Sequence, residues 1–330
     1  MADAATEGTV VSRRAFLGIA AGAAGVAAAG GGVATSYRSE IAAARERVSG
    51  GSSTVATRFG TMEYAVAGSG RPLLMIHGTG GGFDQGLAFT ERLLPMGHQV
   101  IAPSRFGYLG SDFPADPSTA NQADAFADLL DALGIEKLPV AGGSAGALSA
   151  IEFAIRHPDR CSALLAIVPA TYSPDRPSLQ AMSPLQERVL FTMLGSDFLF
   201  WAALKLMRDQ MIGTMLATDP ALVTAASPQE QARAERIMRY ILPVSRRTRG
   251  LLNDARLSAN PARQDIDRIT APTLAISLED DRFGTLDGAR HLVSQVPGAR
   301  LVTWPTGGHI WIGHDEELFA EIDAFLTTIA

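Results

Sequence analysis

Cysteine is nearly absent from this sequence, because Cys161 is the only one in 330 residues. A single thiol excludes an intramolecular disulfide and a zinc site built from clustered cysteines. Cys161 begins an apolar run that extends to Val168 and is typical of a buried strand. Since free cysteine is often simply buried, we expect a core residue here rather than a nucleophile.

Clustered positive charge is also lacking. Lys and Arg total 28 against 34 Asp and Glu, and basic residues form no run beyond the extreme N-terminus. The chain therefore lacks the electrostatic footprint of a nucleic-acid-binding protein. It also lacks an internal repeat and, past Tyr37, any apolar stretch long enough to span a membrane. With 47% hydrophobic residues, the simplest organisation is one large domain carrying an insertion.

The N-terminus has the order of parts found in a targeting segment. Arg13 and Arg14 directly precede an uncharged stretch, Ala15 to Tyr37, made mostly of Ala and Gly. This order predicts a twin-arginine export signal over residues 1–35. Cleavage after Ala34 would give a periplasmic or extracellular protein. Two alternatives stay open: an uncleaved signal that anchors the chain in the membrane, and a helix packed into the domain.

Residues 36–53 mix charged side chains with Ala, Gly and Ser. We expect this segment to be a linker without fold content.

Strand-like and helix-like segments alternate over most of the remaining chain. The short apolar runs that predict strands are Thr54–Phe59, Met62–Val66, Leu73–Ile76, Gln99–Ala102, Leu138–Ala141, Ala163–Val168, Thr273–Ser277 and Arg300–Trp304. Helical patterns separate most of them, among them Thr119–Leu133, Ala145–Arg156 and Asp315–Thr327. This alternation indicates an α/β fold with a mainly parallel sheet flanked by helices.

One stretch interrupts the alternation. Between about Ala170 and Pro261 no segment is typical of a strand, whereas Met, Leu, Phe and Trp recur at helical spacing. We expect a helical cap insertion at 170–261, which would divide the core into 54–169 and 262–330. The aromatic residues of this stretch would either line an apolar substrate pocket or pack the cap onto the core: Phe191, Phe198, Phe200 and Trp201.

The sequence Gly142-Gly143-Ser144-Ala145-Gly146 fits the pattern G-x-S-x-G and lies between a predicted strand and a predicted helix. In this position the pattern indicates a nucleophile elbow, a sharp turn that exposes the serine hydroxyl. The flanking glycines permit a strained backbone and a close strand-to-helix contact. We expect Ser144 to be a nucleophile; the alternative is an ordinary serine in a glycine-rich turn.

A glycine-rich loop, His77 to Gly82, follows the predicted strand Leu73–Ile76. Unobstructed backbone N–H groups in such a loop can stabilise the oxyanion of a tetrahedral intermediate. The best candidates are the amides of Thr79 and Ala145, with Gly80 in place of Thr79 if the loop register differs by one residue. The loop lacks the lysine and the glycine spacing of phosphate-binding loops.

A nucleophilic serine needs a histidine base and an acid that orients this base. His309 lies in a loop directly after the last predicted strand, and His314 is its rival. The acid should follow the preceding strand, where register favours Asp281 over Asp280. The resulting order along the chain is Ser, Asp, His.

With these residues, the chain resembles the α/β-hydrolase superfamily, in the branch of esterases, C–C hydrolases and lactonase-like enzymes with a helical cap. The resemblance covers about Thr54 to Ala330 and includes three further segments. These segments are similar to the family's loop after the fourth strand, to its ending of the helix after the elbow and to its histidine loop: Ile101–Asp112, His157–Arg160 and Gly307–His314. The last of them supports His309 over His314. Where the family usually has glycine before the acidic residues, this chain has Leu278.

The resemblance implies a serine hydrolase that acts on a small-molecule substrate and needs no cofactor or metal. One scaffold hosts many chemistries in this superfamily. Cleavage of an ester of modest size with an apolar part therefore stands beside C–C bond or lactone hydrolysis, perhydrolysis and acyl transfer. A catalytically silent exported binding protein is the alternative from another class. An epoxide hydrolase or dehalogenase would need an aspartate where Ser144 stands.

Overall fold

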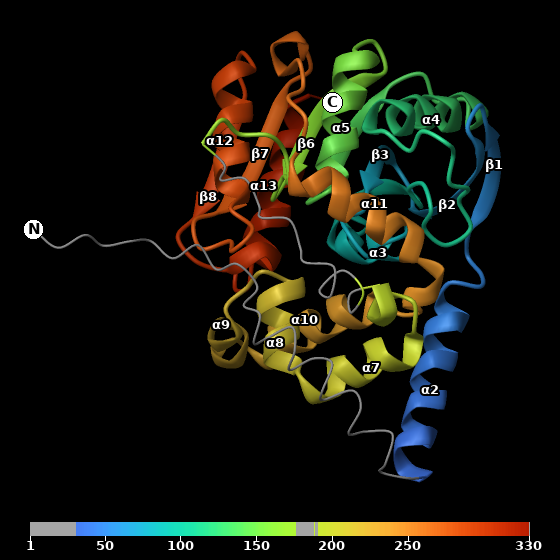
Figure 1. The fold of residues 1–330 in the computed structure, drawn as a ribbon. Coiled ribbons are helices and arrows are strands. Elements are labelled where there is room, and N and C mark those ends of the chain that lie inside the picture. The colour runs from blue at the N-terminus through green and yellow to red at the C-terminus, as the bar shows by residue number, and fades with distance from the viewer. Residues whose placement is uncertain (1–30, 176–187, 189–190, 330) are drawn as a thin grey trace, which may run out of the picture.

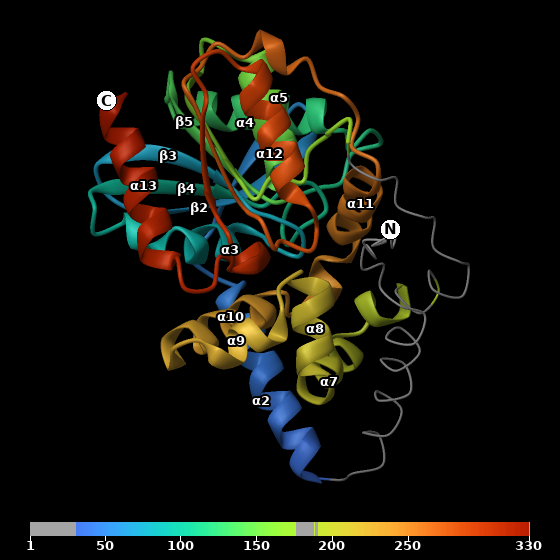
Figure 2. The same ribbon diagram turned by 90° about the vertical axis from the view of Figure 1, so that its left-hand side faces the viewer.

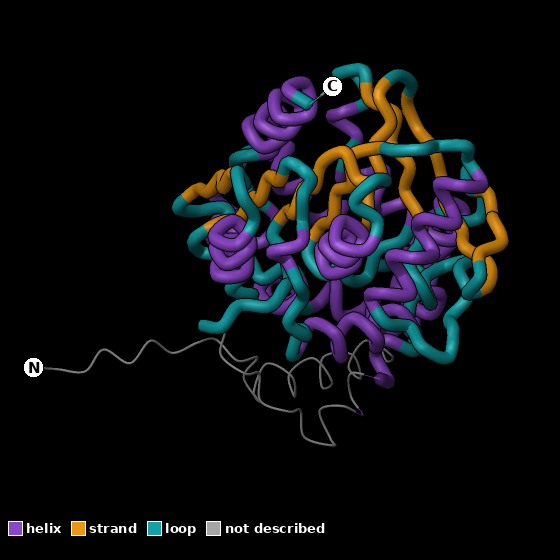
Figure 3. The backbone as a smooth tube through the Cα atoms, turned by 90° about the horizontal axis from the view of Figure 1, so that it is seen from above, coloured by secondary structure: helices purple, strands orange, loops and turns teal. Residues whose placement is uncertain are grey.

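A computed structural model of the protein describes residues 31–175, 188 and 191–329. In these residues the strands form one eight-stranded sheet in the order β1-β2-β4-β3-β5-β6-β7-β8, with helices on both sides (Figures 1 and 3). The strands are β1 (Ser53–Thr57), β2 (Gly60–Gly68), β3 (Arg71–Ile76), β4 (His98–Pro103), β5 (Leu138–Gly143), β6 (Cys161–Ile167), β7 (Thr273–Leu278) and β8 (Arg300–Trp304). The first two and β4 pair antiparallel, and the remaining pairs are parallel. The predicted α/β fold with a mainly parallel sheet is confirmed.

The apolar runs form strands because helices bury both faces of the sheet. Along β3, Leu73 and Met75 belong to one apolar cluster, whereas Leu74 and Ile76 belong to another on the opposite face. The helices of one face are α4 (Thr119–Ala132), α5 (Gly146–Arg156) and α12 (Thr285–Gln295), and those of the other are α3 (Phe83–Phe89) and α13 (Asp315–Thr328). Figure 2 shows these two layers edge-on.

The described part of 170–261 forms a helical insertion between β6 and β7. It comprises α7 (Asp197–Leu206), α8 (Arg208–Met215), α9 (Pro220–Ala225), α10 (Pro228–Tyr240) and α11 (Thr248–Ala259), and most of it lies against one end of the core (Figure 2). Phe200 and Trp201 are buried in an apolar cluster formed mostly by this insertion, whereas Phe191 is half exposed. Of the two roles expected for the aromatic residues, packing therefore applies to Phe200 and Trp201.

The prediction that residues 36–53 form a linker without fold content is wrong. Helix α2 spans Gly31–Arg47 and packs against the helical insertion (Figure 1). The Tyr37 ring lies edge-on to the rings of Phe198 and Trp201, with centroids 5.2 and 5.5 Å apart. At the other end of α2, Arg47 pairs with Asp84 at 3.0 Å. Tertiary contacts hold a helix whose own sequence is only weakly amphipathic.

The predicted export signal, 1–35, lies outside the described residues except for its last five, which begin α2. In the described part of the chain, no helix is both long enough and apolar enough to cross a membrane.

Cys161, the first residue of β6, is buried. Burial raises the pKa of its thiol to about 12, so the thiolate needed for nucleophilic attack does not form near neutral pH. The expectation of a core residue is confirmed.

Candidate active site

Ser144 lies on the turn between β5 and α5, where its backbone has a φ of 50°. This left-handed conformation costs a residue other than glycine about 1–2 kcal/mol. Backbone hydrogen bonds on both sides hold the turn. The Ser144 amide donates to the Ile167 carbonyl at 2.9 Å, and the Ser144 carbonyl accepts from the amides of Ala147 and Ala170 at 3.0 and 3.1 Å.

Two glycines permit the close packing around this turn. A Cβ at Gly142 would lie 2.7 Å from the Ala147 Cα and the Gly146 carbonyl oxygen. A Cβ at Gly146 would lie 2.5 Å from the carbonyl oxygens of Ile76 and His77. Only glycine fits such contacts with backbone atoms, because a backbone atom cannot move aside as a flexible side chain can. The G-x-S-x-G sequence thus lies on a sharp, closely packed turn between β5 and α5.

His309 lies on a short 3-10 turn, Gly308–Ile310, which follows β8. Its Nδ1 is 2.8 Å from Oδ2 of Asp281, whose side chain is fully buried. The same carboxylate accepts from the amide of Phe283 at 2.9 Å and from the hydroxyl of Thr285. Because a carboxylate only accepts hydrogen bonds, Nδ1 carries the hydrogen and Nε2 is left as the basic nitrogen.

The rival residues have other partners. The carboxylate of Asp280 accepts from the amides of Gly307 and Gly308 at 3.1 and 2.8 Å, so it holds the backbone of the histidine loop and not the imidazole. His314 pairs with Glu317 at 2.8 Å and stacks on Trp304. The structure thus places Asp281 and His309 together.

The loop after β3 lies directly beside the elbow. A Cβ at Gly78 would be 3.2 Å from the Ser144 Cβ. The Gly80 amide donates to the Tyr108 hydroxyl at 3.2 Å, which removes it as an alternative to the Thr79 amide. Among the described residues, the amides of Thr79 and Ala145 have no hydrogen-bond partner, and neither do the Ser144 hydroxyl and His309 Nε2.

A buried ion pair that the sequence did not reveal supports this loop. Arg105 follows β4 and forms a bidentate pair with Asp254 of α11, at 2.7 and 2.5 Å. The same guanidinium donates to the carbonyls of His77 and Gly78 at 3.0 and 3.1 Å. Arg105 thus joins the helical insertion to the loop beside the elbow. Arg105 falls within the segment 101–112, which resembles a loop of the family. Asp254 lies in an ordinary amphipathic helix, and no pattern near it in the sequence indicates a buried ion pair.

His77 and Tyr108 complete this buried network. His77 Nε2 accepts from the Arg105 amide at 3.0 Å, so its Nδ1 carries the hydrogen and donates to the Gly78 carbonyl at 2.7 Å. Burial, reinforced by the charge of Arg105, lowers the pKa of His77 well below 6.5. Burial and the charge of Asp254 raise the pKa of Tyr108 well above 10.0, and its hydroxyl donates to Asp254 at 2.5 Å. The histidine is therefore neutral and structural.

A second buried ion pair joins the insertion to the same loop. Arg247, which directly precedes α11, pairs with Asp84 at 2.8 Å and also donates to the Gly81 carbonyl. Arg47 of α2 shares the Asp84 carboxylate. The helical insertion and α2 thus both contact the first turn of α3.

In the described ranges no cluster of three or more His, Cys, Asp or Glu side chains is arranged to hold a metal ion.

The neutral His77 should make the folded state sensitive to acid. Below about pH 6.5 the unfolded chain binds a proton at His77 that the folded chain does not, so stability falls as the pH falls. Between pH 7 and pH 5.5 this linkage amounts to about 1 kcal/mol. The free energy of unfolding, measured with urea at pH 7 and pH 5.5, should fall in the wild type as the pH is lowered. In His77→Gln this fall should be smaller by about 1 kcal/mol. Equal losses in the two proteins would contradict the assignment.

The family described as the alpha/beta hydrolase fold matches residues 71–313. An uncharacterized hydrolase of Bacillus subtilis is 28% identical over 78% of this chain and 91% of its own length. The 2-hydroxy-6-oxo-6-phenylhexa-2,4-dienoate hydrolase of Burkholderia cepacia is 27% identical over 74% of this chain and 82% of its own length.

The solved structure of an alpha/beta hydrolase fold protein from Nakamurella multipartita superposes with a TM-score of 0.63 at 25% identity, and covers 83% of this chain and 98% of that one. The family match spans the region that holds Ser144, Asp281 and His309. The chain belongs to the α/β-hydrolase family, and it is a hydrolase.

Proposed function

We propose that the protein is a serine hydrolase that cleaves an ester or similar acyl bond of a small, partly apolar substrate through an acyl-enzyme. The observation that carries the proposal is the pair of Asp281 and His309, 2.8 Å apart, at the same end of the sheet as the strained turn of Ser144. A buried carboxylate that fixes the imidazole tautomer is what a general base for a serine hydroxyl requires.

In this mechanism, Ser144 Oγ attacks the acyl carbonyl carbon while His309 Nε2 takes the hydroxyl proton. The carbonyl oxygen becomes an oxyanion, which the amides of Thr79 and Ala145 bind, each contributing about 3 kcal/mol. The intermediate collapses with loss of the alcohol, which receives the proton from His309. Water, deprotonated by the same nitrogen, then releases the acid and restores Ser144.

The four groups that this mechanism uses are the Ser144 hydroxyl, His309 Nε2 and the amides of Thr79 and Ala145. Within the residues that the structure describes, all four are free to bind substrate, which fits the mechanism. Neither Ser144 Oγ nor His309 Nε2 has a partner in the described part of the chain. Catalytic hydrogen bonds are often loose before substrate binds and tighten in the complex. The two free amides are likewise available for an oxyanion, because no carbonyl of the described residues accepts from them.

Apolar surface beside the base supports a partly apolar substrate. The Phe283 ring lies edge-on to the His309 ring at 4.9 Å and is 42% exposed. We propose that the helical insertion acts as a cap over this end of the sheet and limits the size of the substrate. Buried arginine pairs fasten this insertion to the loop that carries Thr79, which supports the assignment.

C–C bond hydrolysis on the same three residues is the second candidate. It is favoured by the 27% identity with a hydrolase whose named substrate carries a ketone and no ester. Parallel assay of p-nitrophenyl esters, lactones and a 2-hydroxy-6-oxo-dienoate separates the candidates, because only a C–C hydrolase shortens the dienoate chain.

We further propose export by the twin-arginine route, on the strength of Arg13 and Arg14 before the apolar stretch. Replacement of both arginines by lysine should retain the protein in the cytoplasm of an expressing bacterium, as measured by fractionation. Unchanged export of that variant would contradict the proposal.

Reaction with a fluorophosphonate tests for an activated serine. The intact mass of the protein should rise by one adduct, and Ser144→Ala should show no rise, because only a deprotonated hydroxyl attacks the phosphorus rapidly. Absence of an adduct in both proteins would favour a catalytically silent binding protein over an enzyme.

The adjacent carboxylates provide a matched pair of variants. Asp281→Asn should lower kcat by roughly 10³- to 10⁴-fold, because the amide no longer holds the correct histidine tautomer. Asp280→Asn should lower kcat by less than about tenfold, since its one amide oxygen can still accept from the Gly308 amide, although the bond from the Gly307 amide is lost. Ester hydrolysis at saturating substrate measures kcat for both variants. Equal losses of kcat would contradict the assignment of Asp281 as the carboxylate that orients His309.

A further inference from the structure

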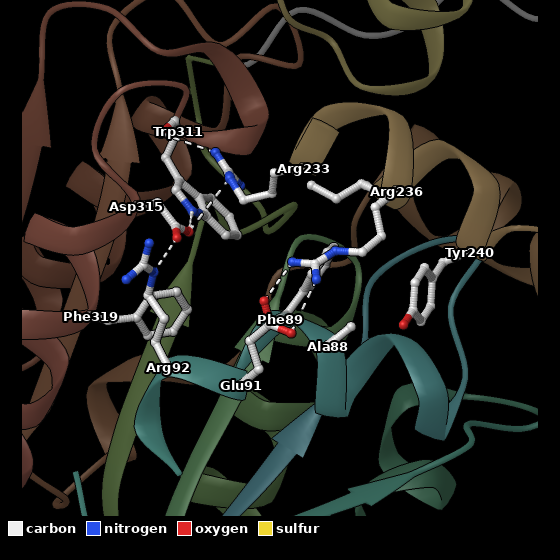
Figure 4. Close-up of a pocket in the computed structure, with 11 residues that line it drawn as sticks. Ala88, Phe89, Glu91, Arg92, Arg233, Arg236, Tyr240, Trp311, Asp315 and Phe319 are labelled. Carbon is white, nitrogen blue, oxygen red and sulfur yellow. Dashed lines mark hydrogen bonds and ion pairs between the residues drawn. The ribbon is translucent and has the colours of Figure 1, made fainter. Parts of the chain in front are cut away.

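The loop that carries His309 is held by the helical insertion as well as by the core. This histidine loop, 307–314, lies against α10, and Figure 4 shows Arg233 of α10 beside Trp311 and Asp315. The Arg233 guanidinium donates to the carbonyls of Ile310 and Trp311 at 2.8 and 3.4 Å. The first of these carbonyls belongs to the residue that directly follows His309.

Glu230 strengthens the contact from the same helix. Its carboxylate accepts two hydrogen bonds from Arg233, at 3.0 and 2.7 Å, and a third from the Gly313 amide at 3.0 Å. Together the two side chains bind two carbonyls and one amide of the histidine loop. Both are largely buried, with 10% and 14% of their side chains exposed, so solvent competes little for these hydrogen bonds.

The backbone of the histidine loop needs such external partners. Trp311 has a φ of 47°, and Gly307, Gly308 and Gly313 also have positive φ values. The hydrogen bonds inside the loop use the carbonyls of Gly307, Gly308 and Trp311, but not that of Ile310. Among the described residues, Arg233 is the donor that satisfies the Ile310 carbonyl.

The peptide units around His309 are therefore fixed from two directions. On the N-terminal side the core residue Asp280 accepts from the Gly308 amide at 2.8 Å. On the C-terminal side Arg233, which belongs to the insertion, donates to the Ile310 carbonyl. A displacement of α10 would thus act on the backbone directly after His309 and leave the core contact before it in place.

The charge of Arg233 is balanced by groups on both sides. Besides Glu230, Asp315 lies 3.6 Å away and also pairs with Arg92 of the core. The Trp311 ring lies under the guanidinium at 5.5 Å. The positive charge of Arg233 is balanced by these carboxylates, and its guanidinium also donates to backbone carbonyls. Its expected effect on His309 is therefore to hold the loop backbone in place, rather than to change the electrostatic potential at the imidazole.

We infer that Arg233 is a positioning residue for His309, and that through it the placement of the helical insertion sets the placement of the general base. This inference rests on the proposed function, because it assumes that His309 activates Ser144. The structure offers a matched control in Arg236, one turn along α10. Arg236 pairs with Glu91 of the core at 2.5 Å and has no hydrogen bond with the histidine loop among the described contacts (Figure 4).

The experiment compares the fluorophosphonate labelling kinetics of the whole protein with those of Arg233→Gln, Arg233→Lys and Arg236→Gln. Labelling at saturation reports on attack by Ser144, and the reagent concentration at half-maximal rate reports on binding. In Arg233→Gln we expect the saturating rate to fall about tenfold, with half-saturation changed less than twofold. Arg233→Lys should recover part of the rate, because an ammonium group can still donate to the Ile310 carbonyl. Arg236→Gln should match the wild type.

The inference is overturned if Arg233→Gln labels as fast as Arg236→Gln, or if only its half-saturation changes. If thermal unfolding shows that Arg233→Gln does not fold, the saturating labelling rate of Arg233→Lys tests the inference instead. A saturating rate at least threefold below the wild type supports the inference, and a wild-type rate overturns it. Failure of the proposed function would look different, because the wild-type protein itself would then carry no label at Ser144.

Discussion

The structure around the active site depends on one buried ion pair, that between Arg105 and Asp254. Two charges removed from water are stabilising only when every donor and acceptor is satisfied. Here the guanidinium also binds the carbonyls of His77 and Gly78, and the carboxylate also accepts from Tyr108. Loss of either partner would leave an uncompensated charge in the interior, at a cost of about 3–5 kcal/mol. Since the pair joins α11 to the loop after β3, it supports both the insertion and the loop that carries Thr79.

The three parts of the site differ in what holds them. Backbone hydrogen bonds within the core hold Ser144, including the one from its amide to Ile167. The loop with Thr79 and the loop with His309 are each held both by the core and by the helical insertion. The proposed nucleophile is therefore held by the core alone, whereas Thr79 and His309 lie in loops that the insertion also holds.

Local patterns in the sequence revealed the sheet and the elbow because both have strict requirements. A strand buried on two faces must be continuously apolar, as in β3, and close packing of α5 on β5 requires glycine at 142 and 146. The choice between Asp280 and Asp281 depended on which carboxylate turns toward the imidazole, and adjacent residues in a loop carry no pattern that decides this. Arg105 and Asp254 are separated by 149 positions, so neither predicts the other. Helix α2 was missed because its stability comes from contacts with α7 and Asp84.

Those contacts of α2 also set an order of events during synthesis. Arg45 binds Asp197, which is 152 positions later, and Arg47 binds the carbonyl of Leu242, which is 195 positions later. Contacts so distant in sequence form late, because the partner must first emerge from the ribosome and fold. The residues that precede Gly31 are thus joined to a helix that has no docking surface until the insertion is complete. A receptor that reads the N-terminus while the chain is still being synthesised would therefore meet it before α2 has docked.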